Sequence, residues 1–364
     1  PGRAAGMWDF LDLLPVLDRS AVVSLGEGAT PLVPSRGPWG GRVLYKLELQ
    51  GPTGSQKDRA LALALTRARE VGAPRVIMAS TGSAGLAGAA YAARAGIPCV
   101  ILVPRGTPEE RLRPMEALGA RIAEVDGSFE QVERILGTIA GQPGWYEATT
   151  KRSANPYQAE APKTIAYELV LDLGGAPDWV VVPVGGGATL FGIWRGFMDL
   201  LQMGRIARAP RMLGVQPARF NALEIAMARG LHTQAELARI GLDEHGSTVA
   251  RNLKHAVPPD GADALRAIRE SNGLAVSVTD DDALRGQQEL GAGEGIFCEP
   301  SSAVVPIAVE RLLKDGVVQR GERVVAVITG SGLRDTAALD APAGRRRIRL
   351  SGTAGRAELE RCVA

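Results

Sequence analysis

Short apolar segments alternate with longer helix-like segments along most of the chain. The segments that predict strands are 43–49, 75–79, 99–103, 121–125, 145–147, 179–184, 211–216, 276–278 and 323–329. The segments that predict helices are 58–70, 84–95, 109–118, 128–139, 157–173, 189–203, 280–291 and 301–314. Ser128 and Gln131 add a capping box to the fourth of these helices. Because strands joined by helices of this length run parallel, the pattern predicts an α/β fold with helices on the sheet faces.

The chain is long enough for more than one such sheet. It has 364 residues, and a linker-like stretch at 149–156 interrupts the alternation. The simplest organisation is two doubly wound α/β units that meet near residues 150–160. The stretch 217–275 is mostly helical without a clear pattern. Ligands of open α/β sheets gather at the carboxyl ends of the strands, so the loops at those ends are the first candidates for a site.

Charge and cysteine content narrow the classes of partner. The formal net charge is +2, so nothing indicates binding to nucleic acid or to an anionic membrane surface. No apolar run approaches the length of about 20 residues that a membrane span needs. The three cysteines, Cys99, Cys298 and Cys362, have no metal-ligand spacing, and their odd number argues against a disulfide framework. We therefore expect a cytoplasmic protein without a metal site.

One lysine lies between a turn-rich loop and the start of a helix. The turn formers Pro-Thr-Gly-Ser occupy 52–55, and a run rich in Ala, Leu and Arg begins at Asp58. Ser55 predicts the N-cap, with Asp58 at a capping-box spacing. Lys57 then lies in the first turn, where the helix dipole disfavours a cation and favours a neutral, nucleophilic amine. An ordinary solvated lysine is the alternative that this loop alone leaves open.

Three further loops follow predicted strands. Ser80-Thr81-Gly82-Ser83 opens a helix and offers hydroxyl and N–H groups to an anion such as a carboxylate. Gly185-Gly186-Gly187-Ala188-Thr189 lets the backbone close around a phosphate at a helix N-terminus. Thr329-Gly330-Ser331-Gly332 presents two hydroxyl groups at a sheet edge. Each loop taken alone is also compatible with an ordinary turn or helix cap.

The glycine loop does not match the nucleotide-binding motifs. A dinucleotide fingerprint would need a glycine at position 190, where the chain has Leu190, and the Walker pattern is absent. A phosphate cup without these signatures indicates a small phosphorylated ligand or cofactor. The histidines His232, His245 and His255 have no partner spacing, and we expect them to be structural or solvated.

Taken together, these loops resemble the fold type II family of pyridoxal phosphate (PLP) enzymes, in particular its threonine synthase-like members. The matching stretches, in the family order, are LGEGATPL (25–32), PTGSQKDR (52–59), ASTGS (79–83), NPYQAEAPKTIAYEL (155–169), VPVGGGATL (182–190), GIFCEPSSA (295–303) and TGSGLRD (329–335). The resemblance implies a tryptophan synthase β-like fold with the active site between two domains. Residues 1–50 and 160–364 would form the large PLP-binding domain. Residues 51–159 would form a small mobile domain that holds the substrate carboxylate.

The resemblance also implies roles for single residues at the cofactor. Lys57 matches the lysine that forms a Schiff base with PLP and later acts as a base at the substrate Cα. The loop from Gly185 to Thr189 matches the cup for the PLP phosphate. Thr329 matches the hydroxyl residue that faces the pyridine nitrogen. Ser83 stands where the family usually has an asparagine beside the phenolic oxygen.

The expected substrate side departs from the threonine synthase pattern. The candidate substrate-binding residues are Ser80, Thr81, Gly82, Ala84, Arg152, Ser153 and Gln158. Threonine synthases read a substrate phosphate partly through an Asn-Ser pair and an arginine, and this chain has Arg152, Ser153 and Gln158 at those positions. Ala84 replaces a threonine of that family. The resemblance thus implies a kept cofactor site and a changed substrate site.

The implied activity is that of a PLP-dependent lyase or synthase acting on an amino acid with a β or γ leaving group. One alternative is a serine or threonine ammonia-lyase. Another is β-replacement on O-phospho- or O-acetylserine, as in cysteine and cysteate synthases. A third is a non-catalytic protein that binds PLP or an amino acid. Since family members are usually dimers, a homodimer is expected.

Overall fold

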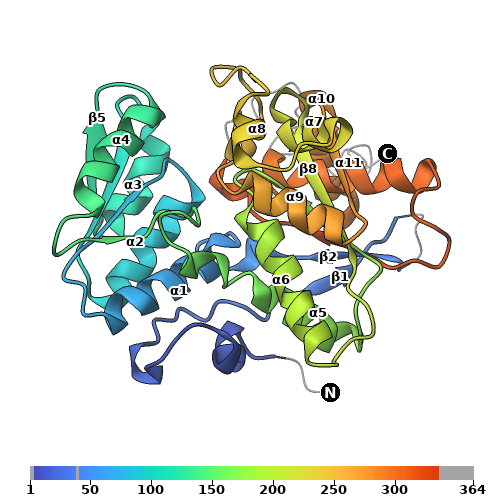
Figure 1. Ribbon diagram of the computed structural model, residues 1–364, viewed down its shortest axis with the longest axis horizontal. Helices are drawn as coiled ribbons and strands as arrows, with labels where there is room; N and C mark the ends of the chain where they lie inside the picture. The colour runs from blue at the N-terminus through green and yellow to red at the C-terminus, as the bar shows by residue number, and fades with distance from the viewer. Residues whose placement is uncertain (1–3, 38–40, 336–364) are drawn as a thin grey trace, which may run out of the picture.

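The computed structural model describes residues 4–37 and 41–335, which form two parallel-sheet units (Figure 1). The smaller sheet has the strand order β5-β4-β3-β6, and all its neighbouring strands pair in parallel. Its strands are β3 (Val76–Ala79), β4 (Cys99–Pro104), β5 (Arg121–Val125) and β6 (Tyr146–Glu147). The predicted α/β class with two parallel sheets is confirmed.

The larger sheet has the strand order β1-β2-β10-β7-β8-β9. Its strands are β1 (Leu32–Pro34), β2 (Val43–Lys46), β7 (Trp179–Pro183), β8 (Arg211–Pro217), β9 (Leu274–Val278) and β10 (Val324–Val327). β1 pairs with β2 in antiparallel orientation, and the other neighbours are parallel. Every residue of the central strands β7 and β10 is buried, as expected for valine-rich strands covered on both faces.

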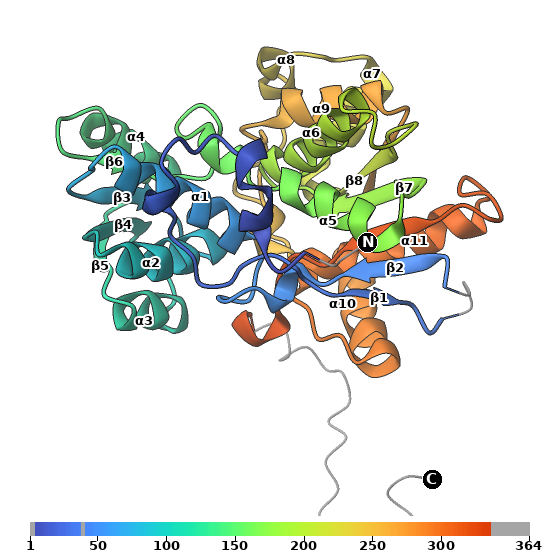
Figure 2. The ribbon, with the colours of Figure 1, turned by 90° about the horizontal axis from the view of Figure 1, so that it is seen from below.

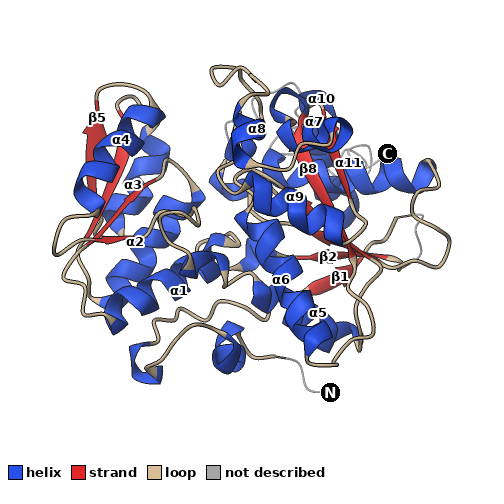
Figure 3. Ribbon diagram, in the orientation of Figure 1, coloured by secondary structure: helices blue, strands red, loops and turns tan. Residues whose placement is uncertain are grey.

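Helices cover the faces of both sheets (Figure 3). The smaller unit carries α1 (Lys57–Glu70), α2 (Ser83–Ala95), α3 (Glu109–Ala117) and α4 (Phe129–Ala140). The larger unit carries α5 (Lys163–Leu173), α6 (Ala188–Gln202), α7 (Ala222–Arg229), α8 (Gln234–Ala238), α9 (Gly261–Glu270), α10 (Asp280–Glu289) and α11 (Pro300–Lys314). Within the described residues, none of these helices is both long and apolar enough to cross a membrane.

Two predicted boundaries were wrong by several residues. The strand expected over 43–49 ends at Lys46, because a 3-10 turn follows at Glu48–Gln50. The helix expected from residue 157 begins at Lys163, after a separate 3-10 turn at Tyr157–Ala159. Pro162, which has no N–H to give to a preceding turn, is the residue that caps the helix.

The capping box predicted at the start of α1 is also wrong. The helix is capped at Gln56 without a side-chain hydrogen bond, and the Asp58 amide donates to the Ser55 carbonyl and not to its hydroxyl. The Asp58 carboxylate accepts hydrogen bonds from the Thr53 amide at 3.0 Å and the Thr53 hydroxyl at 2.6 Å. Gly54, with a φ of +80°, turns the loop so that Thr53 faces Asp58. The box at Ser128 and Gln131 is confirmed, with both of its hydrogen bonds present.

The N-terminal segment packs on the smaller unit. Met7, Leu14 and Val23 belong to the same buried cluster as the helices α1 and α2. Figure 2 shows this segment running past α1 before the chain enters β1. Helix α1 therefore lies between the N-terminal segment and α2. It begins at Lys57, next to the end of strand β10 of the larger sheet, where the Gln56 amide bonds the Thr329 carbonyl.

Candidate active site

The three loops expected at the cofactor follow neighbouring strands of the larger sheet. β2, β10 and β7 lie side by side in the order β2-β10-β7, so the chain segments after them leave the same edge. Backbone hydrogen bonds join the lysine loop to the Thr329 loop. The Gln56 amide donates to the Thr329 carbonyl at 2.9 Å, and the Ser331 amide donates to the Gly54 carbonyl at 2.9 Å. The sheet order thus explains why residues about 270 positions apart meet.

Lys57 is half-buried at the start of α1, and its surroundings disfavour a charge. Burial is the main cause and lowers the pKa of Lys57 to about 8, while the nearby carboxylate of Asp260 partly opposes the shift. A lysine with this pKa is neutral in a sizeable fraction of molecules near physiological pH. Its amine is therefore available as a nucleophile or a base.

Helix α1 is anchored to the larger unit by a buried ion network. Arg59 binds Glu48 through Nε at 2.7 Å and Glu168 through Nη1 at 2.5 Å. Lys46, at the end of β2, binds the other oxygen of Glu168 at 2.7 Å. Each of these four side chains is at most 1% exposed. Since Arg59 is two residues from Lys57, the network fixes the helix turn that carries the amine.

The glycine loop after β7 is packed too tightly for side chains. A Cβ atom at Gly185 would lie 2.7 Å from the Asn252 carbonyl oxygen, and one at Gly187 would lie 2.5 Å from the Asp260 carbonyl oxygen. Gly187 also has a φ of +106°, which favours glycine. Ala188 begins the 15-residue helix α6, whose free N–H groups follow directly. Backbone amides at a helix start, with no side chain above them, are suited to a phosphate.

The hydroxyl of Thr329 lies at the end of β10 in a fixed hydrogen-bonding pair. Its Oγ1 is 2.9 Å from the Oγ of Ser302, in the first turn of α11, and both residues are buried. Ser302 Oγ also accepts a hydrogen bond from the Gly330 amide at 2.9 Å. Ser302 thus holds the Thr329 hydroxyl in place, a role that the sequence did not reveal.

The Ser80–Ser83 loop comes from the other unit and faces the larger one. It follows β3, and the Ser80 hydroxyl accepts hydrogen bonds from the amides of Gly82 at 3.2 Å and Gly85 at 2.9 Å. A Cβ at Gly82 would lie 3.1 Å from Asn252 Oδ1, so the loop contacts the segment that also covers Gly185. Thr81 and Ser83 are half-buried, and Ala84 is buried.

Comparison with known proteins identifies the family. The model of a family described as "Pyridoxal-phosphate dependent enzyme" matches residues 23–330. The chain belongs to this family. The prediction of PLP as the cofactor, and of a PLP-dependent lyase or synthase of the threonine synthase-like type, is confirmed.

The similar proteins include threonine synthases and solved structures of related fold. The threonine synthase of Synechocystis is 38% identical over 329 residues, which cover 88% of this chain and 81% of that protein. The threonine synthase of Methanocaldococcus jannaschii is 36% identical, with 92% and 82% covered. Maize serine racemase matches with a TM-score of 0.69 at 18% identity, with 83% and 88% covered. The structure of O-ureido-L-serine synthase matches with a TM-score of 0.69 at 21% identity, with 91% and 96% covered.

The residues of this enzyme fit the cofactor. PLP has an aldehyde, a phosphate and a ring nitrogen, and the site offers the amine of Lys57, the glycine cup and the Thr329 hydroxyl. The glycines let the loop of the cup pack against the segment 252–260, where a Cβ at Gly185 or Gly187 would meet backbone oxygens. The structure brings these groups together on one edge of the larger sheet, with the Ser80–Ser83 loop opposite.

Two further residues lie near Lys57: Asp260, for which no role was expected, and His255, which was expected to be structural or solvated. Asp260 packs against the glycine loop, and its amide donates to the Gly186 carbonyl at 2.8 Å. His255 lies against Gly185, with its Cδ2 3.3 Å from the position of a Cβ there. Burial, and next the charge of Lys57, lowers the pKa of His255 to about 4, so this imidazole is neutral at physiological pH. Both residues come from the irregular part of 217–275, where no periodicity marks a strand end.

The structure separates the three candidates at 152–158. The Arg152 guanidinium forms an ion pair with Asp263 and lies over the Phe191 ring at 4.6 Å. Ser153 is exposed. Gln158 is 1% exposed, and its Nε2 has no hydrogen-bond partner among the described residues. Only a ligand or a water would satisfy this buried amide.

Proposed function

We propose that this enzyme eliminates an O-linked group from the β or γ carbon of an amino acid and, as a threonine synthase would after loss of a γ phosphate, adds the hydroxyl of water at Cβ and a proton at Cγ. O-phosphohomoserine is the substrate to test first. One observation carries the proposal: the lysine loop, the glycine loop and the Thr329 loop meet at one sheet edge, opposite the Ser80–Ser83 loop. The identity of 33–38% to proteins named threonine synthase supports the choice of reaction.

In this proposal the residues of the chain have distinct tasks at the cofactor. When bound, PLP supplies an electron sink that stabilises negative charge at the substrate Cα. Lys57 Nζ would hold the cofactor through its aldehyde group and would move a proton at the substrate Cα. Gly185, Gly186, Gly187, Ala188 and Thr189 would hold the phosphate. Thr329 would serve the ring nitrogen, and Ser83 the phenolic oxygen.

The substrate residues are assigned in the same way. Ser80, Thr81 and Gly82 would bind the substrate carboxylate, with Ala84 behind them, and Gln158 would contact the rest of the amino acid through its free amide. For Arg152 and Ser153 we propose a weaker contribution. The reason is that Asp263 and Phe191 already hold the Arg152 guanidinium, whereas Ser153 is exposed.

The remaining expectations concern the domains, the assembly and the location. We propose that 51–159 is the small domain and that it turns about the anchored start of α1 against 1–50 and 160–364 when substrate binds. A cavity lined by both units supports this motion. We also infer a homodimer, by analogy with the family. A cytoplasmic location is in keeping with the buried, unpaired thiols of Cys99 and Cys298.

The test is a panel of amino acids offered to the PLP-loaded enzyme. Phosphate release with threonine formation from O-phosphohomoserine is the expected result. Release of a 2-keto acid from serine or threonine would instead identify an ammonia-lyase. Replacement on O-phospho- or O-acetylserine by a sulfur nucleophile would identify a β-replacement enzyme. A change in the cofactor spectrum without exchange of the Cα proton into deuterated water would identify a binding protein.

A further inference from the structure

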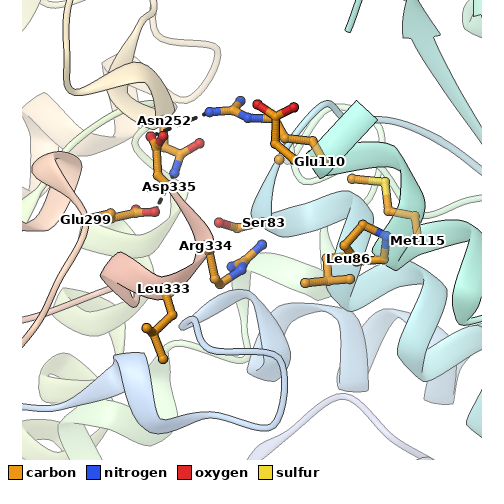
Figure 4. Close-up of a pocket in the computed structure, with 12 residues that line it drawn as sticks. Ser83, Leu86, Glu110, Met115, Asn252, Glu299, Leu333, Arg334 and Asp335 are labelled. Carbon is orange, nitrogen blue, oxygen red and sulfur yellow. Dashed lines mark hydrogen bonds and ion pairs between the residues drawn. The ribbon is translucent and has the colours of Figure 1, made fainter. Parts of the chain in front are cut away.

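A cavity of about 210 Å³ lies between the two units, next to the Ser80–Ser83 loop (Figure 4). The smaller unit contributes Ser83 and Leu86 from α2, and Met115 from α3. The larger unit contributes Glu299 and Arg334, from loops at the edge where Lys57 is held. The cavity therefore has an apolar side, suited to methylene groups, and a polar side that carries a guanidinium.

Arg334 has buried donors without acceptors. Its Nε and Nη1 atoms are shielded from solvent and have no hydrogen-bond partner in the described part of the chain. Burial lowers the pKa of Arg334, and the carboxylates of Glu299 and Asp58 only partly oppose the shift. Figure 4 shows the side chain extending towards Ser83 and Leu86. Arg334 thus borders the cavity, with its two unpaired donors just beneath the cavity surface.

The nearby carboxylates are engaged elsewhere. Glu299 accepts a hydrogen bond from the Asn252 amide at 2.8 Å, and Asp58 accepts its two hydrogen bonds from Thr53. Asp335, also at the cavity, is paired with Arg111 and with Arg251, each at 3.5 Å. No described carboxylate therefore satisfies the Arg334 fork.

A buried guanidinium left in this state is costly, because each missing hydrogen bond leaves a desolvated donor. Arg59 shows the satisfied case in the same protein, with carboxylates at both edges of its guanidinium. Arginine selects carboxylate and phosphate groups, whose paired oxygens match its planar fork. An anionic group with two or more oxygens is therefore the kind of acceptor that best suits this guanidinium.

We propose that Arg334 binds the distal phosphate of the amino-acid substrate in this cavity. The inference rests on the proposed function and deepens it, since it names the residue that selects a phosphorylated substrate. Substrate carbons beyond Cα would lie along Leu86 and Met115, while the carboxylate is held by the Ser80–Ser83 loop. Arg334 would then replace the phosphate contacts that this chain lacks at Arg152 and Gln158, where the family has an asparagine and an arginine.

The test uses the PLP-loaded enzyme and follows ligand binding through the cofactor absorbance. Arg334→Met should weaken binding of O-phosphohomoserine by about 10- to 100-fold, the range expected for charge-assisted hydrogen bonds. It should leave the affinity for L-threonine, which lacks the phosphate, within about twofold. Arg334→Lys keeps the charge without the fork and should lose about three- to tenfold. Arg113→Met is the matched control, because Arg113 on α3 is 77% exposed and lies outside the cavity.

A second measurement does not depend on the identity of the amino acid. Inorganic phosphate should raise the unfolding temperature of the PLP-loaded wild type and of Arg113→Met, but not that of Arg334→Met. Equal phosphate stabilisation of wild type and Arg334→Met, or none in either, would overturn the Arg334 proposal. If phosphate acts through Arg334 but O-phosphohomoserine does not change the wild-type spectrum, the proposed function fails and the anion site stands. If O-phosphohomoserine changes the spectrum of the wild type and of Arg334→Met at equal concentrations, the Arg334 proposal fails and the proposed function stands.

Discussion

The two sides of the site are built by different means. The proposed cofactor side comprises 54–57, 185–189 and 329–331, and backbone hydrogen bonds and close glycine contacts hold it. The proposed substrate side comprises 80–84, 152–158 and Arg334, and side chains form most of its contacts. Unsatisfied buried donors occur on the substrate side, at Gln158 and Arg334. The cofactor side therefore depends on Lys57 and on glycines at fixed backbone positions, whereas a few side-chain substitutions are enough to change the ligand of the substrate side.

Removal of the amine on the cofactor side should have the largest effect. Lys57→Ala deletes both the covalent attachment point and the base, so activity should fall by at least about 10³-fold. The visible absorbance band of the PLP-loaded enzyme should disappear, as recorded by a spectral scan after addition of PLP. Because the chain around residue 57 is held by backbone contacts, the unfolding temperature should change little. A variant that keeps the band would show that another amine holds the cofactor.

A methyl group in the glycine cup tests whether the backbone fit matters. Gly185→Ala would place Cβ 2.7 Å from the Asn252 carbonyl oxygen. Overpacking of this kind costs about 1–3 kcal/mol, so the PLP dissociation constant should rise by about 10- to 100-fold. Gly186→Ala is the matched comparison, since its nearest neighbour is Pro259 Cγ at an ordinary 3.4 Å. Equal losses in the two variants, measured by PLP titration, would mean that the tight contact is not what shapes the cup.

The lowered pKa of Lys57 predicts how cofactor capture depends on pH. The neutral amine is the reactive form, so the rate of PLP capture by the apoenzyme should rise as the pH rises through about 8. Between pH 7 and pH 9 the neutral fraction grows by about tenfold and then levels off. Stopped-flow measurement of absorbance would record the curve. An amine with an ordinary pKa would instead show a rate that keeps increasing to pH 10.

The contrast also explains what the sequence could predict. The box at Ser128 was predictable because both partners lie within one helical turn. The box at Ser55 failed because Asp58 binds Thr53 across a turn that only the folded loop defines. The motif at 329–335 was recognised. The role of Arg334, however, depends on which nearby carboxylates are already paired with other residues. Such occupancy is a property of tertiary packing and leaves no local pattern.

The same limit applies to the neighbours of the cofactor. His255 and Asp260 reach Lys57 from a segment without regular structure, so neither strand alternation nor motif spacing pointed to them. It was easier to predict that Lys57, the glycine cup and Thr329 lie together. Short loops after buried strands must meet where the strands are neighbours. The sheet order that makes them neighbours was implied by the family resemblance and not by the residues alone.

The smallest expected effect separates the two arginines of the substrate side. Arg152→Met removes an ion pair with Asp263 whose partners are 30% and 32% exposed. Such pairs contribute about 1 kcal/mol or less, and the backbone hydrogen bond from Arg152 to Asp260 survives the change. The Michaelis constant for O-phosphohomoserine should therefore rise by no more than about threefold. Asp263→Asn breaks the same pair from the other end. It should lower the unfolding temperature by the same small amount as Arg152→Met.

Steady-state kinetics on Arg152→Met, Asp263→Asn and Arg334→Met decide which arginine binds the phosphate of the substrate. If Arg152 served only to bind Asp263, both variants at that pair would behave alike and only Arg334→Met would lose affinity for the phosphorylated substrate. A loss in Arg152→Met as large as that in Arg334→Met would show that the guanidinium leaves Asp263 when substrate arrives. In that case the substrate side would resemble the threonine synthase pattern more closely than its residues at 152 and 153 indicate.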